Sequence, residues 1–144
     1  MINSIKLENW KTHLNSELFF SQGTNVLIGK MGAGKSSVVE GICFALFGTF
    51  PQLNQKKVSL DEVVMQKPVK KEFAKVTLNF QVNNKSYLVE RIIFSANKSN
   101  QANLYENSKL IAGPKTSEVT QRIESLLSID FDLFSRAIYC EQND

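Results

Sequence analysis

Apolar and polar residues alternate along the first part of the chain in a pattern typical of short β-strands. Residues 2–8 carry Ile5 and Leu7 on one side and polar side chains on the other, which predicts a strand with one buried face. The polar stretch 9–13 predicts a loop, and a second strand is expected to close at 18–20. The chain is therefore expected to begin with two strands joined by a loop.

The next segment changes from a strand pattern to a helix pattern. The run 25–28 is apolar and contains two β-branched residues, which predicts a strand buried on both faces. Residues 38–47 are apolar on nearly every side and predict a buried helix, which Gly48 is suited to end. Two strands and a turn thus precede the first strand-to-helix connection, an order that departs from a plain doubly wound fold.

The middle of the chain predicts two hairpins. Apolar residues alternate with polar ones at 76–82, and Asn83-Asn84 is suited to a two-residue turn, so 87–94 is expected to return as the partner strand. A smaller hairpin is expected at 104–111, and the polar stretch 95–103 before it predicts a loop.

The remaining segments are less regular. From 49 to 71 the periodicity fades, Pro51 and Pro68 are expected to interrupt regular structure, and one helical turn is predicted at 60–65.

Helical spacing returns after Pro114 and predicts a helix over 119–127, followed by a short turn at 130–134 and a buried strand at 137–140. With no repeat or linker in view, residues 1–144 are expected to form a single domain.

Composition narrows the class only slightly. The 144 residues are 42% hydrophobic and 22% charged with a net charge of +3, which is ordinary for a globular domain and permits a nucleic-acid partner without requiring one. Cys43 and Cys140 lie far apart with no Cys-x-x-Cys spacing, so both are expected to be reduced core thiols. No long apolar run or signal-peptide pattern is present, so we expect no membrane partner and a cytoplasmic location.

The stretch from Gly29 to Ser36 carries the strongest chemical signal, because it fits G-x-x-x-x-G-K-[ST], the phosphate-binding loop or Walker A motif. Glycines let consecutive backbone N–H groups converge on one anion. Lys35 then adds a mobile positive charge for the outer phosphates, and the Ser36 hydroxyl can coordinate Mg²⁺. The predicted strand before the loop and helix after it are the context that this motif requires.

Two other polar features have more ordinary interpretations. The basic run 67–71 favours a solvated loop over a DNA contact. His13, the sole histidine, has no supporting carboxylate nearby in the sequence, so a hydrogen bond that orders the loop is expected instead of general-base catalysis.

Several segments beyond the loop resemble SMC-like ABC ATPases, and most closely the Rad-fifty ATPase type of DNA double-strand-break repair, which works with the Mre-eleven nuclease. The matching stretches are 9–13, 23–25, the doubled Ser36-Ser37, 45–48, 87–91 and 137–142. The last of these resembles that family's Q-loop. The resemblance implies an α/β fold: the N-terminal lobe of an ABC-ATPase head, a P-loop NTPase with a buried Walker A strand-loop-helix and an added antiparallel β-sheet.

The resemblance also implies a set of site residues. Lys11 stands where the family has a basic residue that touches the nucleotide phosphates, and Lys35 would contact the β- and γ-phosphates. Ser36 and Gln142 would complete the Mg²⁺ shell, and Gln142 would help to position the attacking water. The expected cofactors are ATP and Mg²⁺, and the phosphate cradle would consist of Met31, Gly32, Ala33, Gly34, Lys35, Ser36 and Ser37.

Two residues depart from the family pattern. Met31 replaces the usual Asn, so a side-chain hydrogen bond is lost and the backbone N–H remains; this change bears on turnover more than on binding. Asn143 replaces the Gly after the Q-loop glutamine, which is a mild change because Asn tolerates positive φ.

The sequence contains no Walker B run of four apolar residues ending in Asp-Glu, no Ser-Gly-Gly signature loop, no heptad coiled coil and no metal hook. It is therefore expected to be half of a head, either a split gene product or a fragment. The implied partners are the C-terminal half of the same head, a second head in an ATP-dependent homodimer, an Mre-eleven-type nuclease and double-stranded DNA. The implied location is with the nucleoid, or nuclear in a eukaryote.

Other classes stay open at this point. A cohesin-, SbcC- or RecF-type head would share these motifs, and a non-catalytic subunit that senses ATP would share the loop. A self-contained P-loop kinase would need an acceptor pocket and a lid with arginines, whereas Arg91, Arg122 and Arg136 are dispersed along the sequence.

Overall fold

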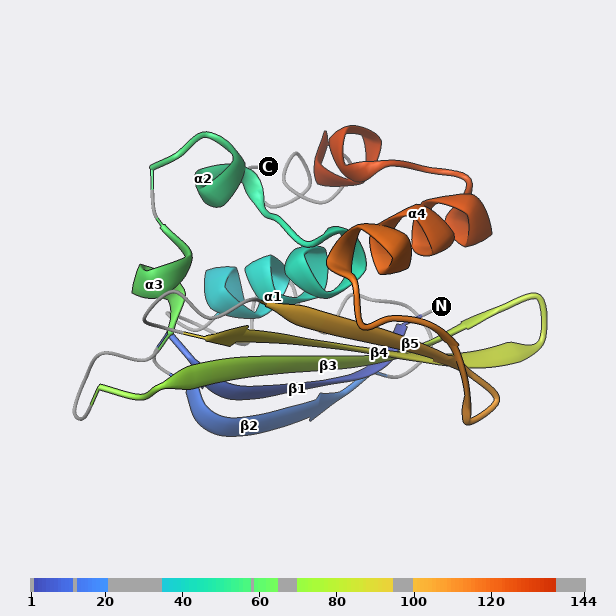
Figure 1. Cartoon of the computed structure of the whole chain (residues 1–144), viewed down its shortest axis with the longest axis horizontal. Helices are drawn as coiled ribbons and strands as arrows, with labels where there is room; N and C mark the ends of the chain where they lie inside the picture. The colour runs from blue at the N-terminus through green and yellow to red at the C-terminus, as the bar shows by residue number, and fades with distance from the viewer. Residues whose placement is uncertain are drawn as a thin grey trace.

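A six-stranded antiparallel sheet forms the base of the molecule (Figure 1). The computed structural model describes residues 2–11, 13–20, 35–57, 59–64, 70–94 and 100–136, without the side chains of 35, 36, 60 and 61. In space the strands follow the order β2-β1-β3-β4-β5-β6. Their bounds are β1 Ile2–Trp10, β2 His13–Phe19, β3 Phe73–Val82, β4 Lys85–Phe94, β5 Gln101–Glu106 and β6 Lys109–Ala112.

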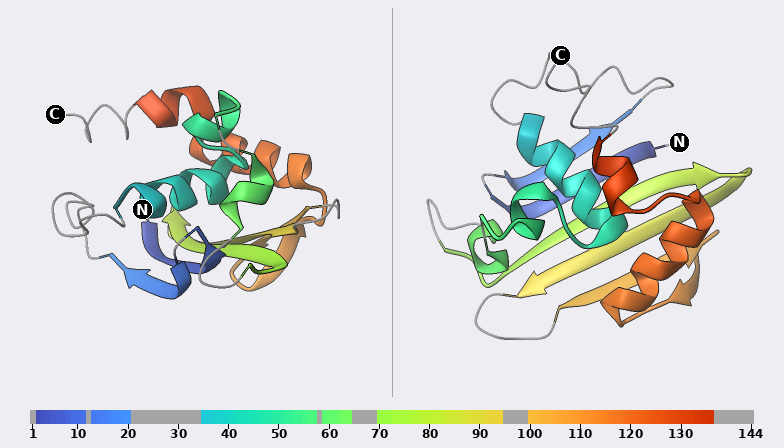
Figure 2. Two further views of the ribbon diagram at one scale, coloured as in Figure 1. Left: turned by 90° about the vertical axis from the view of Figure 1, so that its left-hand side faces the viewer. Right: turned by 90° about the horizontal axis from the view of Figure 1, so that it is seen from above.

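The helices of the described part lie on one face of this sheet, and the views in Figure 2 show the same two layers. Helix α1 packs against β1, β3 and β4, and α4 packs against β5 and β6 as well as α1. No described element covers the opposite face. The helices are α1 Lys35–Phe47, α2 Pro51–Asn54, α3 Leu60–Val63 and α4 Thr116–Leu127, and residues 131–136 are also helical.

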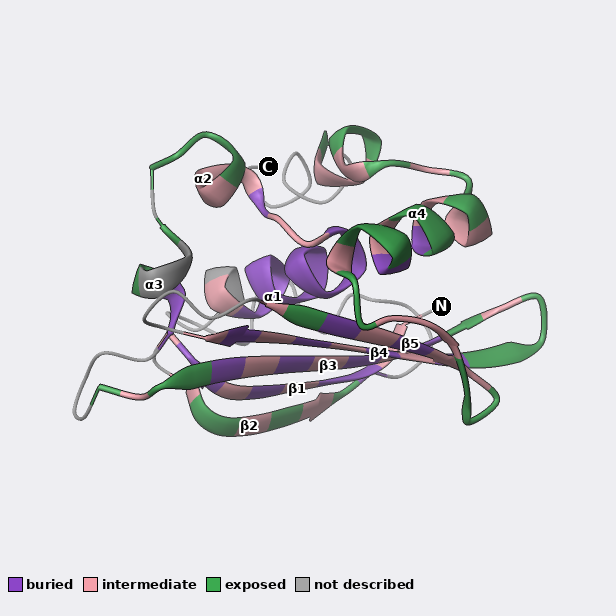
Figure 3. Cartoon of the chain, in the orientation of Figure 1, coloured by how far each residue is buried: buried purple, intermediate pink, exposed green. Residues whose placement is uncertain are grey.

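The hydrophobic core lies between α1 and the sheet, where burial alternates along each central strand (Figure 3). In β3 the inward residues from Ala74 to Phe80 are buried, while the residues between them are half-buried on the opposite face. Helix α1 is buried from Val38 to Phe47, as its apolar sequence predicts. The buried helix and the one-sided strands of the sequence analysis are thus confirmed.

Both predicted hairpins of the middle segment are confirmed. Asn83 and Asn84 join β3 to β4 with φ of +52° and +67°, and Asn107 and Ser108 join β5 to β6 with +48° and +70°. Asparagine accepts this left-handed conformation more readily than most residues, which explains its place in both turns. The expected loop 95–103 is wrong at its end, because β5 already begins at Gln101 and pairs there with Ile92.

The N-terminal hairpin is tighter than the sequence predicts. The stretch 9–13 was expected to be a polar loop, yet β1 continues to Trp10 and β2 begins at His13. Asn9 and Lys11 both take positive φ, at +55° and +52°, which turns the chain within very few residues. The turn also directs Trp10 into the core, where its side chain is fully buried.

Two short helices occupy the segment where periodicity fades. Pro51 begins α2 instead of breaking regular structure, because the first turn of a helix does not need the N–H that proline lacks. The helical turn predicted at 60–65 is confirmed as α3, with Ser59 and Glu62 forming a capping box at its start.

The C-terminal predictions are confirmed as far as the structure describes them. Helix α4 begins two residues after Pro114, and the turn predicted at 130–134 is helical over 131–136. The strands predicted at 25–28 and 137–140 lie outside the described residues. In the described part of the chain no helix is long and apolar enough to cross a membrane.

Candidate functional site

The first turns of α1 are the centre of the candidate site. The described part of this helix runs from Lys35 to Phe47, so the Lys-Ser pair of the phosphate-binding motif occupies its first two positions. No acidic residue lies in the first turn, so no side-chain charge of that turn opposes the positive end of the helix dipole. A helix that starts in this way suits an anionic ligand such as the phosphates of ATP.

The end of β1 is fixed against these first turns. The Trp10 indole N–H donates to the carbonyl oxygen of Ser37 over 3.0 Å, and the Lys11 backbone N–H donates to the Val63 carbonyl over 2.7 Å. Gly41 lets α1 approach β1 closely, since a Cβ there would lie 2.8 Å from a methyl of Leu7. The fold therefore brings two of the predicted site residues, Lys11 and Ser37, to the same part of α1.

The Lys11 side chain forms an ion pair with Glu40 on α1. The ammonium nitrogen lies 2.5 Å from Glu40 Oε1 and 5.2 Å from the centre of the Phe50 ring, within range of a cation–π interaction. The Glu40 side chain is 4% exposed and that of Lys11 is 26% exposed. Glu40 lies about 7.5 Å further along the helix axis than Lys35, at a rise of 1.5 Å per residue.

The other predicted site residues fall outside what the structure describes. Residues 31–34 and Gln142 are not among the described residues, and neither are the side chains of Lys35 and Ser36. The described residues contain no cluster of three or more His, Cys, Asp or Glu side chains that could hold a metal. The predicted Mg²⁺ ligands, Ser36 and Gln142, therefore stay predictions.

His13 and Cys43 have the ordinary roles expected of them. His13 Nδ1 lies 3.0 Å from the Ser16 hydroxyl, so the expected hydrogen bond forms, although it lies within β2 and not in a loop. Desolvation lowers the His13 pKa below its ordinary value. Burial, reinforced by the charge of Glu40, raises the pKa of the Cys43 thiol to about 12. Cys43 is a free cysteine in the core, as expected, and Cys140 lies outside the described residues.

A second polar group lies at the other end of α1. Arg91 is 2% exposed, and its guanidinium donates to the carbonyls of Ala45 and Leu46 and to the Thr120 hydroxyl, over 2.7, 3.2 and 2.9 Å. Desolvation lowers the pKa of Arg91 to about 10. Arg91 thus joins β4, the carbonyl end of α1 and α4, beside a cavity of about 430 Å³.

Sequence reasoning missed Glu40 and Arg91, although the sequence contains a signal for each. Glu40 is the one charged residue of the stretch 38–47, which is apolar on nearly every side. Arg91 occupies an inward position of β4, in the same alternation that buries Val89 and Ile93. A charged residue at a position that the pattern predicts to be buried indicates a specific partner.

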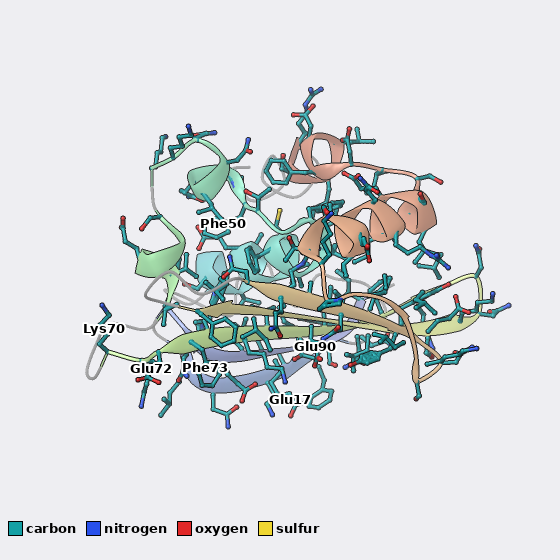
Figure 4. All side chains as sticks on the ribbon, in the orientation of Figure 1. Glu17, Phe50, Lys70, Glu72, Phe73 and Glu90 are labelled. Atoms are coloured by element: carbon teal, nitrogen blue, oxygen red, sulfur yellow. The ribbon has the colours of Figure 1, made fainter. Side chains whose placement is uncertain are left out.

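Charges on the uncovered sheet face are mixed. Figure 4 shows Glu17, Phe73 and Glu90 on the side of the sheet away from the helices. On this face Lys75 pairs with Glu90 at 3.5 Å. Lys85 pairs with Glu106 at 3.8 Å on the other face, at the end of the sheet, where Glu106 lies opposite Tyr87. Lys70 is exposed and Lys71 is half-buried just before β3, whereas Lys67 lies outside the described residues.

The fold of this chain has counterparts among solved proteins. It resembles the protein in a study of ATP-driven dimerization and DNA-stimulated activation of SMC ATPases, with a TM-score of 0.64 over 90% of this chain and 80% of that chain at 17% identity. It also resembles the recombination mediator RecF with ATP (TM-score 0.61, 19% identity, 83% of this chain and 30% of that one). The fold is therefore that of an SMC- or RecF-type ATPase head, which confirms the predicted fold class.

Sequence comparison gives the family. The chain belongs to the family described as an AAA domain, whose model matches residues 4–144. Over its whole length it is 38% identical to the DNA double-strand break repair Rad50 ATPase of Methanococcus maripaludis and 32% identical to that of Methanocaldococcus jannaschii. It spans 14% and 13% of the length of these two relatives, in their N-terminal part, which confirms the resemblance to the N-terminal half of a Rad50-type head.

Proposed function

We propose that this chain is the ATP-binding N-terminal lobe of a Rad50-type ATPase that acts in DNA double-strand-break repair. One observation carries the proposal: Lys11, just after β1, is paired with Glu40 beside the first turns of α1, the helix whose described part begins with the Lys35-Ser36 pair. Full-length similarity to Rad50 ATPases supports the same function.

The residues of this chain would bind the triphosphate in complementary ways. Backbone N–H groups of residues 31–34 and of the start of α1 would donate to phosphate oxygens, and Lys35 would neutralise the outer phosphates. Lys11 would add a second positive charge from the side of β1. Ser36 and Gln142 supply hard oxygen ligands of the kind that Mg²⁺ prefers, and the ion when bound would stabilise charge on the phosphates.

Hydrolysis would require more than this lobe. The chain has a single Asp-Glu pair, Asp61-Glu62, and the Glu62 side chain forms the capping box of α3 with Ser59. A carboxylate that accepts the proton of the attacking water would therefore come from the C-terminal half of the head. We propose that ATP then joins two such heads into a homodimer and that this assembly regulates an Mre-eleven-type nuclease on DNA ends.

Contact with double-stranded DNA would be electrostatic and independent of base sequence. The sheet lysines with ion pairs, Lys75 and Lys85, already have carboxylate partners, so the exposed Lys70 and the basic run around it are better candidates. A net charge of +3 gives only modest general attraction to phosphates.

The positions of the three arginines do not favour a self-contained P-loop kinase. Arg91 is buried and bonded to α1 and α4, and Arg136 pairs with Asp132 on the exposed helical turn 131–136. Arg122 lies on α4, where it lines a cavity together with Ile111 and Ala112 of β6. These arginines do not form a group that could close over a nucleotide.

The first test concerns Lys35. Lys35→Ala is expected to weaken Mg·ATP binding at least tenfold, or about 1.4 kcal/mol, because the substitution removes the charge that follows the phosphate loop directly. Calorimetric titration of both proteins measures the difference. Lys75→Ala is a matched control on the uncovered sheet face and should bind ATP like the parent chain. Equal affinity of the Lys35→Ala and parent proteins would contradict the proposed function.

A further inference from the structure

Glu40 is an unusual residue for its position. It is 3% exposed, on a helix whose neighbouring residues, from Val38 to Phe47, form the centre of the hydrophobic core. Burying a carboxylate is costly unless it is paired and hydrogen-bonded. The partner that the described residues provide is the Lys11 ammonium at 2.5 Å.

Both the backbone and the side chain of Lys11 are fixed by contacts. Its backbone has a φ of +52° and its N–H donates to the Val63 carbonyl, while the indole N–H of the preceding Trp10 donates to the Ser37 carbonyl. Its side chain passes Phe50 to reach Glu40. The ammonium therefore lies near the first turns of α1 and not free in solvent.

The pair leaves donors for a ligand. An ammonium group has three N–H donors, and the hydrogen bond recorded for Lys11 within the described residues uses one of them. The side chain remains 26% exposed, so it is accessible from outside the core. If a phosphate drew Lys11 away entirely, Glu40 would stay buried without its counter-charge, which is strongly unfavourable. A bridge in which Lys11 contacts both groups avoids this cost.

We propose that Glu40 is a positioning residue for nucleotide binding: it fixes the Lys11 ammonium beside the first turns of α1, and from there Lys11 donates to the nucleotide phosphates while it stays paired with Glu40. This inference rests on the proposed function, since it names how that same site orients one of its charges. It assigns to Glu40 an effect on ATP affinity that a purely structural ion pair would not have.

The test is a double-mutant cycle on the 144-residue chain, with Mg·ATP affinity measured by calorimetry. Glu40→Gln keeps the shape of the side chain but removes its charge, and it is expected to weaken binding about fivefold to tenfold. The double variant Lys11→Met/Glu40→Gln is expected to bind ATP with an affinity within about threefold of that of Glu40→Gln, because the two residues act through one contact. The double variant also contains no unpaired buried charge, so it keeps the test available if Lys11→Met alone does not fold.

Two controls separate positioning from general effects of charge. Glu90→Gln removes a carboxylate from the Lys75 ion pair on the uncovered sheet face and should leave ATP affinity unchanged. Glu106→Gln removes the carboxylate partner of Lys85, far from the proposed site in the sequence, and should likewise leave ATP affinity unchanged. Unfolding by urea, measured for every variant, shows whether a change in affinity is separate from a change in stability.

The outcomes are distinct. If Glu40→Gln lowers stability but binds ATP as tightly as the parent chain, Glu40 is structural and the inference is wrong. Tighter binding by Glu40→Gln would also overturn it, because Glu40 would then compete with ATP for Lys11. If the parent chain binds no ATP, or if Lys35→Ala leaves binding intact, the proposed function itself fails. If Glu40→Gln binds ATP more weakly than the parent chain, and Lys35→Ala does so too, the results support both the inference and the proposed function.

Discussion

Three charged residues explain much of how this lobe is built around α1. Lys11 and Glu40 form an ion pair beside the first turns of the helix, and Arg91 donates to the carbonyls at its last turn. Each charge is placed where the helix dipole or a partner side chain stabilises it. The two ends of one helix are therefore fixed by side chains that come from β1 and β4.

The sole histidine gives a simple test at the scale of one residue. Desolvation disfavours the charged form of His13, so its pKa in the folded chain lies below 6.5 and folding favours the neutral ring. The folded state is then expected to lose stability as the pH falls from 6.5 through the folded-state pKa, and to keep this contribution at higher pH. A proton NMR titration of the His13 ring measures the midpoint directly, with the urea-unfolded chain as the reference. A folded midpoint at or above the unfolded one would contradict this expectation.

Prediction from sequence worked unevenly at this scale. The phosphate-loop motif predicted a helix after the loop, and α1 includes Lys35 and Ser36, because the order of loop and helix is a local property of that motif. The resemblance implied only that Lys11 contacts the phosphates, and its place beside α1 was not predicted, since no local rule brings residue 11 next to residue 40. The Lys11–Glu40 and Arg91–Thr120 contacts join residues 29 apart in the sequence, beyond the reach of periodicity.

At the scale of elements, local chemistry predicted most of the structure. Alternation gave β3 and β4, and helical spacing gave α1 and α4. Gly48 ends α1 with φ of +76°, and its N–H donates to Phe44, as a helix-ending glycine should. Errors arose where tertiary pairing overrode a polar sequence: at 9–13, where a hairpin closes, and at 101–103, which pairs with β4.

The connection between α1, β4 and α4 gives a test at this scale. Arg91→Met is expected to lower the free energy of unfolding by about 2–4 kcal/mol, because it leaves buried carbonyls of α1 without their donor and removes the bond to Thr120. Arg136→Met is the matched control, since the Arg136 side chain is 71% exposed and its pair with Asp132 should contribute less than about 1 kcal/mol. Urea denaturation followed by circular dichroism measures both. Similar losses for the two variants would show that the Arg91 contacts do not stabilise α1.

At the scale of the whole molecule, the order of strands was beyond sequence reasoning. Strand β1 pairs with both β2 and β3, although the phosphate-loop region and α1 lie between β2 and β3 in the chain. Periodicity says which face of a strand is buried but not which strand lies beside it. In the resulting fold the described helices all lie on one face of the sheet, and α1 crosses the centre of that face (Figure 2).

This arrangement supports binding more than turnover, and the last prediction follows from it. The described part supplies the start of α1, with Lys11 beside it, and the sequence adds the phosphate loop and Gln142, but no acidic pair follows a run of four apolar residues. We expect the purified chain to bind ATP and to hydrolyse it about 10²–10⁴-fold more slowly than the complete head, because a missing general base typically costs that factor.

Adding the matching C-terminal half, in trans or on a linker, should restore turnover and cause the heads to dimerise with ATP. In that restored assembly Gln142→Ala should lower the rate more than it lowers ATP affinity. Steady-state phosphate release measures the rates, and light scattering measures the dimer. Turnover by the unaided chain at an ordinary enzyme rate, lost on Lys35→Ala, would contradict the half-head interpretation and favour a self-contained P-loop kinase.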